Sequence, residues 1–326
     1  MNTFAFDNLA HAKPNTIPVV FIMGATATGK TDIAALLSEK NPAKLISVDS
    51  SLVYRGMDIG TAKPDDDFLK QYPHDLIDIR NPNQTYSAAD FCHDAQILIT
   101  ETTKQGMLPI LVGGTSFYFS ALEKGLPSMP QANDEIRARL DNEANTIGWD
   151  NLYRRLKEVD PDSAKRIKPT DSQRIQRALE VNEITGKPVA SLNQAEKLIQ
   201  NPIIKVALVH SDRRYLHQRI RQRFDVMIES GLIAEIENLL SIYDKNCSAF
   251  RMIGYRQIIE GLDSGESLDS MIEKSIIATR QLAKRQLTWL RNQSNVLWQN
   301  ANSNKLPEIS HLLTNYLEDW IRFYIK

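Results

Sequence analysis

The feature that most constrains the fold is the segment Gly24-Ala25-Thr26-Ala27-Thr28-Gly29-Lys30-Thr31. Its spacing, G-x-x-x-x-G-K-[ST], is that of a phosphate-binding loop. An apolar run over residues 19–23 precedes it, and a helical pattern with Ile33, Leu36 and Leu37 on one side follows it. Because strand, glycine-containing loop and helix are the context that the motif requires, a chance match is the weaker interpretation. The sequence therefore predicts a polyphosphate site, without saying which polyphosphate binds there.

Each part of this loop has a chemical task. Gly24 and Gly29 let the backbone turn so that successive N–H groups point into one concavity, a nest for phosphate oxygens. The start of the following helix adds positive potential. Lys30 supplies a mobile point charge, and the hydroxyl of Thr31 suits Mg²⁺ or a phosphate oxygen. Thr31 is thus the expected metal ligand.

Composition sets the broad class of the chain. The 326 residues, 42% hydrophobic and 24% charged, are typical of a globular protein with one large domain or two. No apolar run approaches the roughly 18 residues of a membrane span, and residues 1–17 lack a signal-peptide pattern. We therefore expect a flexible N-terminal tail over residues 1–17 on a cytoplasmic protein that acts as a monomer. Cys92 and Cys247 are too few and too isolated for a disulfide scaffold or a zinc site.

Strand and helix signals alternate through the first third of the chain. Strands are expected at residues 19–23, 44–48, 75–79 and 109–112. A capping-box pattern, Ser87 followed by Asp90, begins a helix that runs to about Gln105. This alternation predicts an α/β fold of the P-loop type, with a doubly wound, mostly parallel sheet and ligands at the C-terminal ends of its strands.

The pattern changes after a linker that contains Gly125, Pro127 and Pro130. Residues 134–196 show only helical patterns, and a strand returns at residues 203–209. Helices are then expected at 212–230, 232–242, 254–262, 268–291 and about 307–324. The predicted organisation is a core of residues 18–125 and 200–326, ending in C-terminal helices, with an all-helical insertion over residues 126–199.

Asp49 stands at the C-terminal end of the strand next to the phosphate-binding loop. A carboxylate there could remove a proton from a nucleophile that attacks near the phosphates. It could instead bind Mg²⁺ through water, or only cap the following turn. Position alone leaves these alternatives open.

The strand at residues 109–112 runs into Gly113-Gly114-Thr115 rather than into an aspartate. Motor and switch ATPases are therefore disfavoured, because they hold Mg²⁺ with an aspartate at such a place. The two glycines would allow a ligand to approach the backbone closely, and Thr115 offers a hydroxyl to a phosphate oxygen. A plain tight turn is the alternative.

Basic residues cluster locally although the net charge is −1. Each cluster by itself would be an ordinary solvated helix face. Three clusters with Tyr255 and Trp289 among them favour a polyanion larger than a nucleotide. The clusters are Arg174 and Arg177 beside Gln173, then Arg213, Arg214, Arg219, Arg221 and Arg223, and finally Arg280, Lys284 and Arg291.

Together these segments resemble the bacterial tRNA dimethylallyltransferases, also called tRNA isopentenyltransferases, of the IPP transferase family. The resemblance runs from Gly24 to about Trp298. Ala25 and Thr28 depart mildly from the family pattern, and there is no C-terminal zinc finger like that of eukaryotic relatives, so no zinc is expected. The segments that carry the resemblance are the phosphate-binding loop, residues 49–64, 113–115, 174–181, 254–257 and 278–291.

The resemblance implies transfer of a five-carbon prenyl group from dimethylallyl diphosphate to the exocyclic amine of the adenosine 3′ of the anticodon. Asp49 would bind that amine and remove its proton, Thr115 would contact the released oxygen, and Arg223 would neutralise the departing charge. The diphosphate would be held, with Mg²⁺, by Gly24, Ala25, Thr26, Ala27, Thr28, Gly29, Lys30 and Thr31.

The partner implied is the tRNA anticodon stem-loop, gripped by the helical insertion and with its target base extruded from the stack. The family's RNA contacts correspond to Asp49, Ser50, Ser51, Leu52, Arg137, Gln173, Arg174, Ile175, Gln176, Arg177, Arg251, Met252, Ile253, Gly254, Tyr255, Arg256, Lys284, Arg285, Gln286, Leu287, Thr288, Trp289, Leu290 and Arg291. Three alternatives remain open: prenyl transfer to free AMP or ADP, a small-molecule kinase with ATP in the loop, and an RNA-binding protein with an inactive loop.

Overall fold

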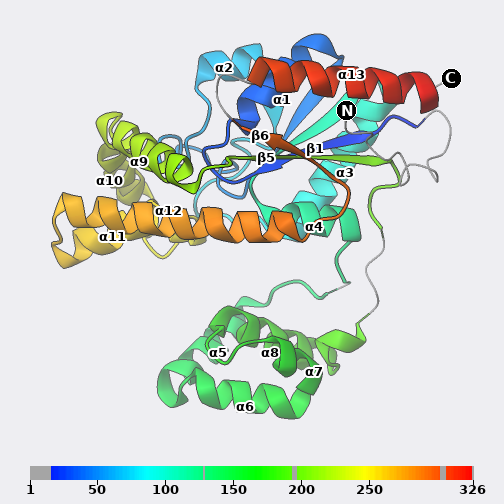
Figure 1. Ribbon diagram of the computed structural model, residues 1–326. Coiled ribbons are helices and arrows are strands. Elements are labelled where there is room, and N and C mark those ends of the chain that lie inside the picture. The colour runs from blue at the N-terminus through cyan, green and yellow to red at the C-terminus, as the bar shows by residue number, and fades with distance from the viewer. Residues whose placement is uncertain (1–15, 128, 193–196, 302–305, 325–326) are drawn as a thin grey trace. The chain divides into compact units, whose positions relative to one another are not determined.

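The computed structural model describes residues 16–127, 129–192, 197–301 and 306–324 (Figure 1). The chain divides into two compact units. One contains the described residues up to Glu123 and from Ile199 onward, and the other is Lys124–Leu198. The expected tail over residues 1–17 lies outside the described residues, except for Thr16 and Ile17. No helix in the described ranges is long and apolar enough to span a membrane.

The larger unit is built on a six-stranded sheet in which every described strand pair is parallel, in the order β3-β2-β4-β1-β5-β6. The prediction of an α/β fold with a parallel sheet is confirmed. Asp49 was expected on the strand next to the phosphate-binding loop, but β4 lies between β1 and β2. The strands are β1 (Val19–Gly24), β2 (Ala43–Val48), β3 (His74–Asp75), β4 (Leu108–Gly113), β5 (Ile203–Val209) and β6 (Val296–Asn300).

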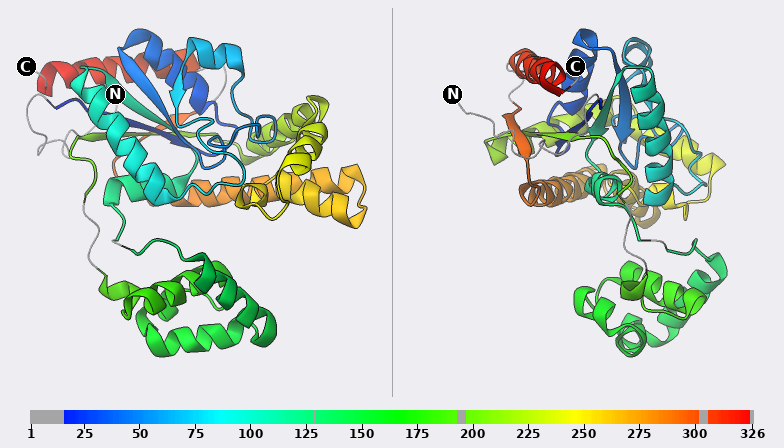
Figure 2. Two further views of the ribbon diagram at one scale, coloured as in Figure 1. Left: turned by 180° about the vertical axis from the view of Figure 1, so that it is seen from behind. Right: turned by 90° about the vertical axis from the view of Figure 1, so that its right-hand side faces the viewer.

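Helices cover both faces of this sheet (Figure 2). On one face, α1 (Lys30–Lys40) and α13 (Leu306–Tyr324) bury their apolar side chains against alternate residues of the strands. On the other face, Phe119 of α4 (Ser116–Lys124) packs against Phe21 of β1, with ring centroids 5.0 Å apart. Because both faces are covered, the central strands are continuous apolar runs rather than alternating ones.

The remaining helices of this unit follow their sequence signals closely. In α3 (Ala88–Lys104), Ser87 and Asp90 form the predicted capping box. After β5 come α9 (Arg213–Glu229), α10 (Leu232–Ile242), the short η3 (Ser248–Arg251), α11 (Tyr255–Ser264) and α12 (Leu268–Arg291). Helix α12 packs against both α9 and α11.

The second unit is helical throughout its described residues. Its elements are α5 (Asp134–Ile147), α6 (Trp149–Val159), α7 (Pro161–Arg166), α8 (Ser172–Thr185) and η2 (Val189–Ser191). Leu140, Leu152, Leu156 and Ile175 form the centre of a separate small core. The unit thus buries apolar surface of its own, as an independent insertion must.

One local prediction was wrong, and two short elements were not predicted. The strand expected at residues 75–79 ends at Asp75, because Leu76 and Asp78 have φ angles of 65° and 54°. Helix α2 (Asp66–Gln71) was missed since none of its residues is buried, so it has no apolar periodicity. Strand β6 was missed because it is a five-residue strand at the edge of the sheet with no fully buried side chain.

Candidate active site

The phosphate-binding loop connects β1 to α1 and has the backbone of a nest. Ala27 and Gly29 have positive φ angles of 62° and 76°. The N–H groups of Ala27, Thr28 and Gly29 donate to no acceptor among the described residues. At Gly24, a Cβ would lie 2.7 Å from the carbonyl oxygen of Leu208, so a side chain there would disturb the start of the loop. The segment therefore offers converging donors to an anion.

Two carbonyl groups of the same loop are fixed by hydrogen bonds within the protein. The carbonyl of Ala25 accepts hydrogen bonds from the hydroxyl of Thr28 at 2.8 Å and from Nζ of Lys30 at 2.7 Å. The carbonyl of Ala27 accepts one from Nε of Arg219 at 3.0 Å and lies 3.1 Å from Nε2 of His210. Because these bonds fix the carbonyl groups, the N–H groups keep one orientation.

Cationic side chains surround the nest. Burial lowers the pKa of Lys30 to about 8, although the nearby charge of Asp49 opposes the shift. Burial also lowers the pKa of Arg223, again with Asp49 opposing and Arg219 adding to the effect. Arg223 donates to the hydroxyl of Thr26 at 3.3 Å. Lys30 and Arg223, whose charged forms are disfavoured in this way, would gain from a bound polyanion.

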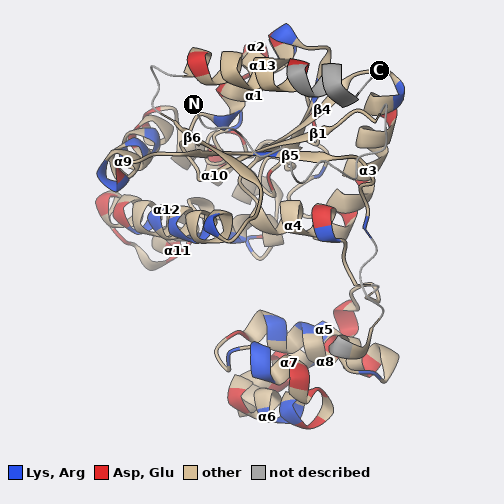
Figure 3. Cartoon of the chain, turned by 45° about the vertical axis from the view of Figure 1, so that its right-hand side comes forward, with Lys and Arg blue, Asp and Glu red and all other residues tan. Residues whose placement is uncertain are grey.

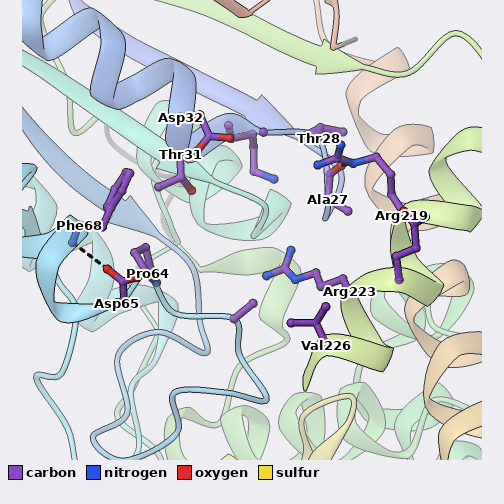
Figure 4. Close-up of a pocket in the computed structure, with 14 residues that line it drawn as sticks. Ala27, Thr28, Thr31, Asp32, Pro64, Asp65, Phe68, Arg219, Arg223 and Val226 are labelled. Carbon is purple, nitrogen blue, oxygen red and sulfur yellow. Dashed lines mark hydrogen bonds between the residues drawn. The ribbon is translucent and has the colours of Figure 1, made fainter. Parts of the chain in front are cut away.

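Arg219 and Arg223 lie one turn apart on α9 and point toward the loop (Figure 4). They border a cleft of about 550 Å³. The cleft is lined by Ala27, Thr28, Gly29, Lys30, Thr31, Asp32, Ala62, Pro64, Asp65, Phe68, Arg219, Gln222, Arg223 and Val226. The loop N–H groups and the cations suit a diphosphate, and the apolar side chains suit its ester group.

Asp49 follows the last residue of β2. Its Oδ1 accepts hydrogen bonds from the N–H group of Ser51 at 2.9 Å and from the Ser51 hydroxyl. The turn-capping alternative is therefore correct for one oxygen. Oδ2 has no donor among the described residues and remains available to a substrate. The charge of Asp49 acts on Lys30 and Arg223, because it opposes the lowering of both pKa values by burial.

Thr115 follows β4, between the strand that carries Asp49 and the strand that carries the loop. Its Oγ1 accepts the N–H group of Ser50 at 3.0 Å. Gly113 and Gly114, which precede Thr115, were expected to let a ligand approach the backbone closely. In the structure, other parts of the protein lie in this space. A Cβ on Gly113 would lie 2.0 Å from the Val48 carbonyl oxygen, and one on Gly114 would lie 2.6 Å from Nε2 of Gln286.

Comparison with known proteins identifies the family. Residues 52–293 match the family described as IPP transferase. The chain belongs to the IPP transferase family. A tRNA dimethylallyltransferase of Thiobacillus denitrificans is 50% identical over 278 residues, 84% of this chain and 89% of that relative.

Two solved structures agree with this membership. The tRNA isopentenylpyrophosphate transferase of Bacillus halodurans is 35% identical, with a TM-score of 0.68 over 94% of this chain and 98% of its own. A eukaryotic dimethylallyltransferase, solved while acting on tRNA, is 25% identical, with a TM-score of 0.74 over 94% of this chain and 78% of its own.

The cleft of this IPP transferase offers hard oxygen ligands that would suit a divalent cation such as Mg²⁺. The hydroxyl of Thr31 and the carboxylates of Asp32 and Asp65 line the cleft. Among the described residues, no cluster of three or more His, Cys, Asp or Glu side chains forms a complete metal cage. One or two protein oxygens completed by substrate phosphates and water are typical of Mg²⁺, so these residues fit that ion.

Some expected RNA contacts have side chains inside the fold. Tyr255 and Ile175 are 0% exposed and Leu290 is 1% exposed. Gln286, 8% exposed, accepts the N–H group of Thr26 at 3.0 Å and donates to the carbonyl of Gly114 at 2.8 Å. In this structure these side chains hold the elements that carry their exposed neighbours, and the prediction that these residues contact RNA stays a prediction.

The exposed neighbours are mostly basic. Lys and Arg recur along α9 and α12 (Figure 3). Lys284, Arg285 and Arg291 on α12 are exposed, as are Arg251 at the end of η3 and Arg256 in the first turn of α11. Within the larger unit, five of the sequence-predicted contacts are therefore cations exposed to solvent.

In the helical unit, the predicted arginines have different surroundings. The guanidinium groups of Arg137 and Arg177 pair with Glu180, which is 0% exposed. Burial would raise the pKa of Glu180, but the hydrogen bond from Arg177 and further ones lower it below its usual value. Gln173 and Arg174 are exposed, and the Arg174 side chain keeps 71% of its surface accessible. Arg174 is thus the freer cation.

Sequence reasoning missed part of the site. Arg219 was assigned only to a general basic cluster, and His210 and the cleft residues Ala62, Pro64 and Asp65 were not assigned a role. The signal was present for Ala62 and Pro64, because the segment 49–64 was recognised as family-specific, whereas Asp65 lies just beyond it. The contact of Arg219 with the loop depends on the angle between α9 and β1, which no sequence pattern gives.

Proposed function

We propose that this protein transfers a dimethylallyl group from dimethylallyl diphosphate to the exocyclic amine of the adenosine 3′ of the anticodon in tRNA, releasing diphosphate. The observation that carries the proposal is the juxtaposition of a phosphate nest, flanked by Lys30 and Arg223, with a carboxylate whose Oδ2 is available. Membership of the IPP transferase family supports it.

The donor's diphosphate would lie against the N–H groups of residues 27–31, since the N–H group of Thr26 donates to Gln286. As the allylic carbon–oxygen bond breaks, its electron pair stays on the diphosphate oxygen and negative charge builds up there. Lys30, Arg219 and Arg223, which line the same cleft, would stabilise that charge. Thr115 would contact the oxygen that is released.

The acceptor amine would attack the allylic carbon while Asp49 takes its proton. An adenine amine is a weak nucleophile, so a positioned base contributes about 10²–10⁴-fold to the rate. Ser51 holds Oδ1 and thereby fixes the orientation of Oδ2. Mg²⁺, when held by Thr31 with Asp32 or Asp65, would neutralise part of the diphosphate charge.

Each unit, taken by itself, presents residues that would contact the RNA. The exposed cations of α9, α11 and α12 and the residues Gln173 and Arg174 of the helical unit suit phosphate and 2′-hydroxyl groups of an anticodon stem-loop. We further propose that the protein acts in the cytoplasm and as a monomer.

A donor-exchange assay tests the function. The chain is incubated with an anticodon stem-loop RNA and either prenyl-labelled dimethylallyl diphosphate or γ-labelled ATP. The expected result is label in the RNA from the prenyl donor alone. Transfer of phosphate from ATP would instead indicate a kinase, and prenylation of free AMP in preference to RNA would indicate a nucleotide prenyltransferase. Either result would contradict the proposal.

A further inference from the structure

Glu235 of α10 makes four hydrogen bonds that no part of the proposed reaction uses. Its Oε2 accepts the N–H groups of Asp58 at 2.9 Å and Ile59 at 2.7 Å. Its Oε1 accepts the N–H group of Gly60 at 3.1 Å and the hydroxyl of Tyr255 at 2.6 Å. Three successive backbone N–H groups that converge on one anion form a nest. A side-chain carboxylate therefore binds this loop as a phosphate binds a phosphate-binding loop.

The loop is also packed against the helices that hold it. A Cβ on Gly60 would lie 2.6 Å from the ring of Tyr255 and 2.8 Å from Cδ1 of Leu232. Tyr255 is 0% exposed, and burial and then Glu235 raise the pKa of its hydroxyl far above the usual value, so it stays a donor. The segment 58–60 can therefore approach α10 and α11 this closely only with a glycine at residue 60.

The held segment continues directly into the cleft. The N–H group of Ala62 donates to the carbonyl of Ile59 at 2.9 Å, and that of Lys63 donates to the carbonyl of Asp58 at 2.9 Å. Ala62, Pro64 and Asp65 line the cleft, and we call these three residues the cleft wall. Only one residue, Thr61, separates the segment bound by Glu235 from the first residue of the wall.

A second anchor acts on the same turn. The amine of Lys63, whose side chain is 4% exposed, donates to the carbonyl of Tyr54 at 2.9 Å and pairs with Asp58 and Asp78. With this anchor and Glu235 both in place, the cleft wall has little freedom to move relative to α10. Figure 4 shows Pro64 and Asp65 of the wall across the cleft from Thr28 and Arg219.

We propose that Glu235 is a positioning residue of the donor site, which fixes the cleft wall at the distance from the phosphate-binding loop that diphosphate binding requires. The inference rests on the proposed function for the identity of the donor, but not for the binding of a diphosphate. A residue that only stabilised the fold would lower the melting temperature and leave the affinity for diphosphate unchanged.

The test compares Glu235→Gln with Glu123→Gln in the full chain. Glu123 pairs with Lys205 at 2.5 Å and lies outside the cleft, so its variant removes a carboxylate contact from the same unit without touching the site. Titration with inorganic pyrophosphate in the presence of Mg²⁺ gives the dissociation constant, and thermal melting reports stability. For Glu235→Gln we expect the dissociation constant to rise about tenfold, as misplacement of a supporting residue would cause.

A steady-state assay adds the donor KM at saturating stem-loop RNA. We expect the KM of Glu235→Gln to rise with the dissociation constant while kcat changes by less than about threefold. Glu123→Gln should keep the wild-type values of both. Two milder variants complete the series if Glu235→Gln does not fold. Glu235→Asp should raise the dissociation constant about threefold, and Tyr255→Phe, which removes one of the four hydrogen bonds, by less than about twofold.

The result that would overturn the inference is a pyrophosphate dissociation constant within about twofold of wild type for Glu235→Gln or, should it not fold, for Glu235→Asp. Failure of the proposed function looks different, because then the wild-type chain itself would transfer no prenyl group. Pyrophosphate titration would still decide the role of Glu235 in that case.

Discussion

Two loops of the larger unit, one after β1 and one after β2, carry backbone nests of the same chemistry. In the first, the N–H groups of residues 27–29 donate to no acceptor among the described residues and border the cleft. In the second, the N–H groups of residues 58–60 all donate to Glu235. The first nest leaves its N–H groups available to an anion from outside, whereas the second is saturated by a carboxylate of the protein.

The difference shows how the fold divides ligand binding from positioning. Cations surround the first nest, and burial with mutual repulsion lowers the pKa values of Lys30 and Arg223, so a bound polyanion relieves a cost already present. The second nest binds a carboxylate of the protein itself, that of Glu235 on α10. It therefore makes the loop more rigid and does not bind a ligand. Substitutions in the first loop should therefore change ligand affinity directly, and substitutions around the second should change it through geometry.

The largest effect is expected at Asp49, which lies between the two loops in the chain. Asp49→Asn keeps the size of the side chain but removes its ability to take a proton. Prenyl transfer should fall by about 10²–10⁴-fold, while binding of the stem-loop RNA stays within a few-fold. Single-turnover kinetics and a binding titration measure the two quantities. Full transfer activity in this variant would remove the assignment of the general base.

Lys30 should give the next largest effect and tests the first nest itself. Lys30→Met removes a charge-assisted hydrogen bond to the diphosphate, and the dissociation constant for dimethylallyl diphosphate should rise about 10–100-fold. Lys40→Met is the matched control, because Lys40 is exposed at the other end of the same helix. Equal affinities for the two variants would mean that the donor binds elsewhere.

The smallest effect is expected in the helical unit. There, Arg174 and Arg177, which the sequence pattern does not distinguish, should behave differently when replaced. Arg174→Ala should weaken RNA binding a few-fold and reduce the slope of log K against log[salt] by about 0.7–0.9, the value of one lost phosphate contact. Arg177→Ala should mainly lower the melting temperature, because Arg177 pairs with the buried Glu180. A salt slope that changes only in Arg177→Ala would reverse these roles.

The sequence predicted the frame of the molecule well, because long apolar runs and capping motifs are local signals. The strands at 19–23 and 109–112 and the capping box at Ser87 lie where they were expected. The turn at Leu76 was missed since it is set by hydrogen bonds from the following residues to the segment 52–53, which are distant in sequence. The short α2 and β6 have too few buried side chains to produce a pattern.

The site was predicted less completely, for a related reason. Motif spacing identified the phosphate-binding loop and Asp49, whose neighbours in sequence carry the information. The contacts of Arg219, His210 and Gln286 with that loop join elements nearly 200 or more residues apart, so no local pattern reports them. Glu235 is an ordinary helical glutamate in the sequence, and only the structure brings the N–H groups of residues 58–60 to it.

The most direct test of the central claim is a crystal structure of the chain with Mg²⁺, a non-cleavable thiolo analogue of dimethylallyl diphosphate and an anticodon stem-loop. The account predicts that the diphosphate oxygens accept the N–H groups of Ala27, Thr28 and Gly29. It also predicts that the extruded adenine amine lies within hydrogen-bond distance of Oδ2 of Asp49. A diphosphate bound away from these N–H groups, or an adenine amine out of reach of Asp49, would contradict it.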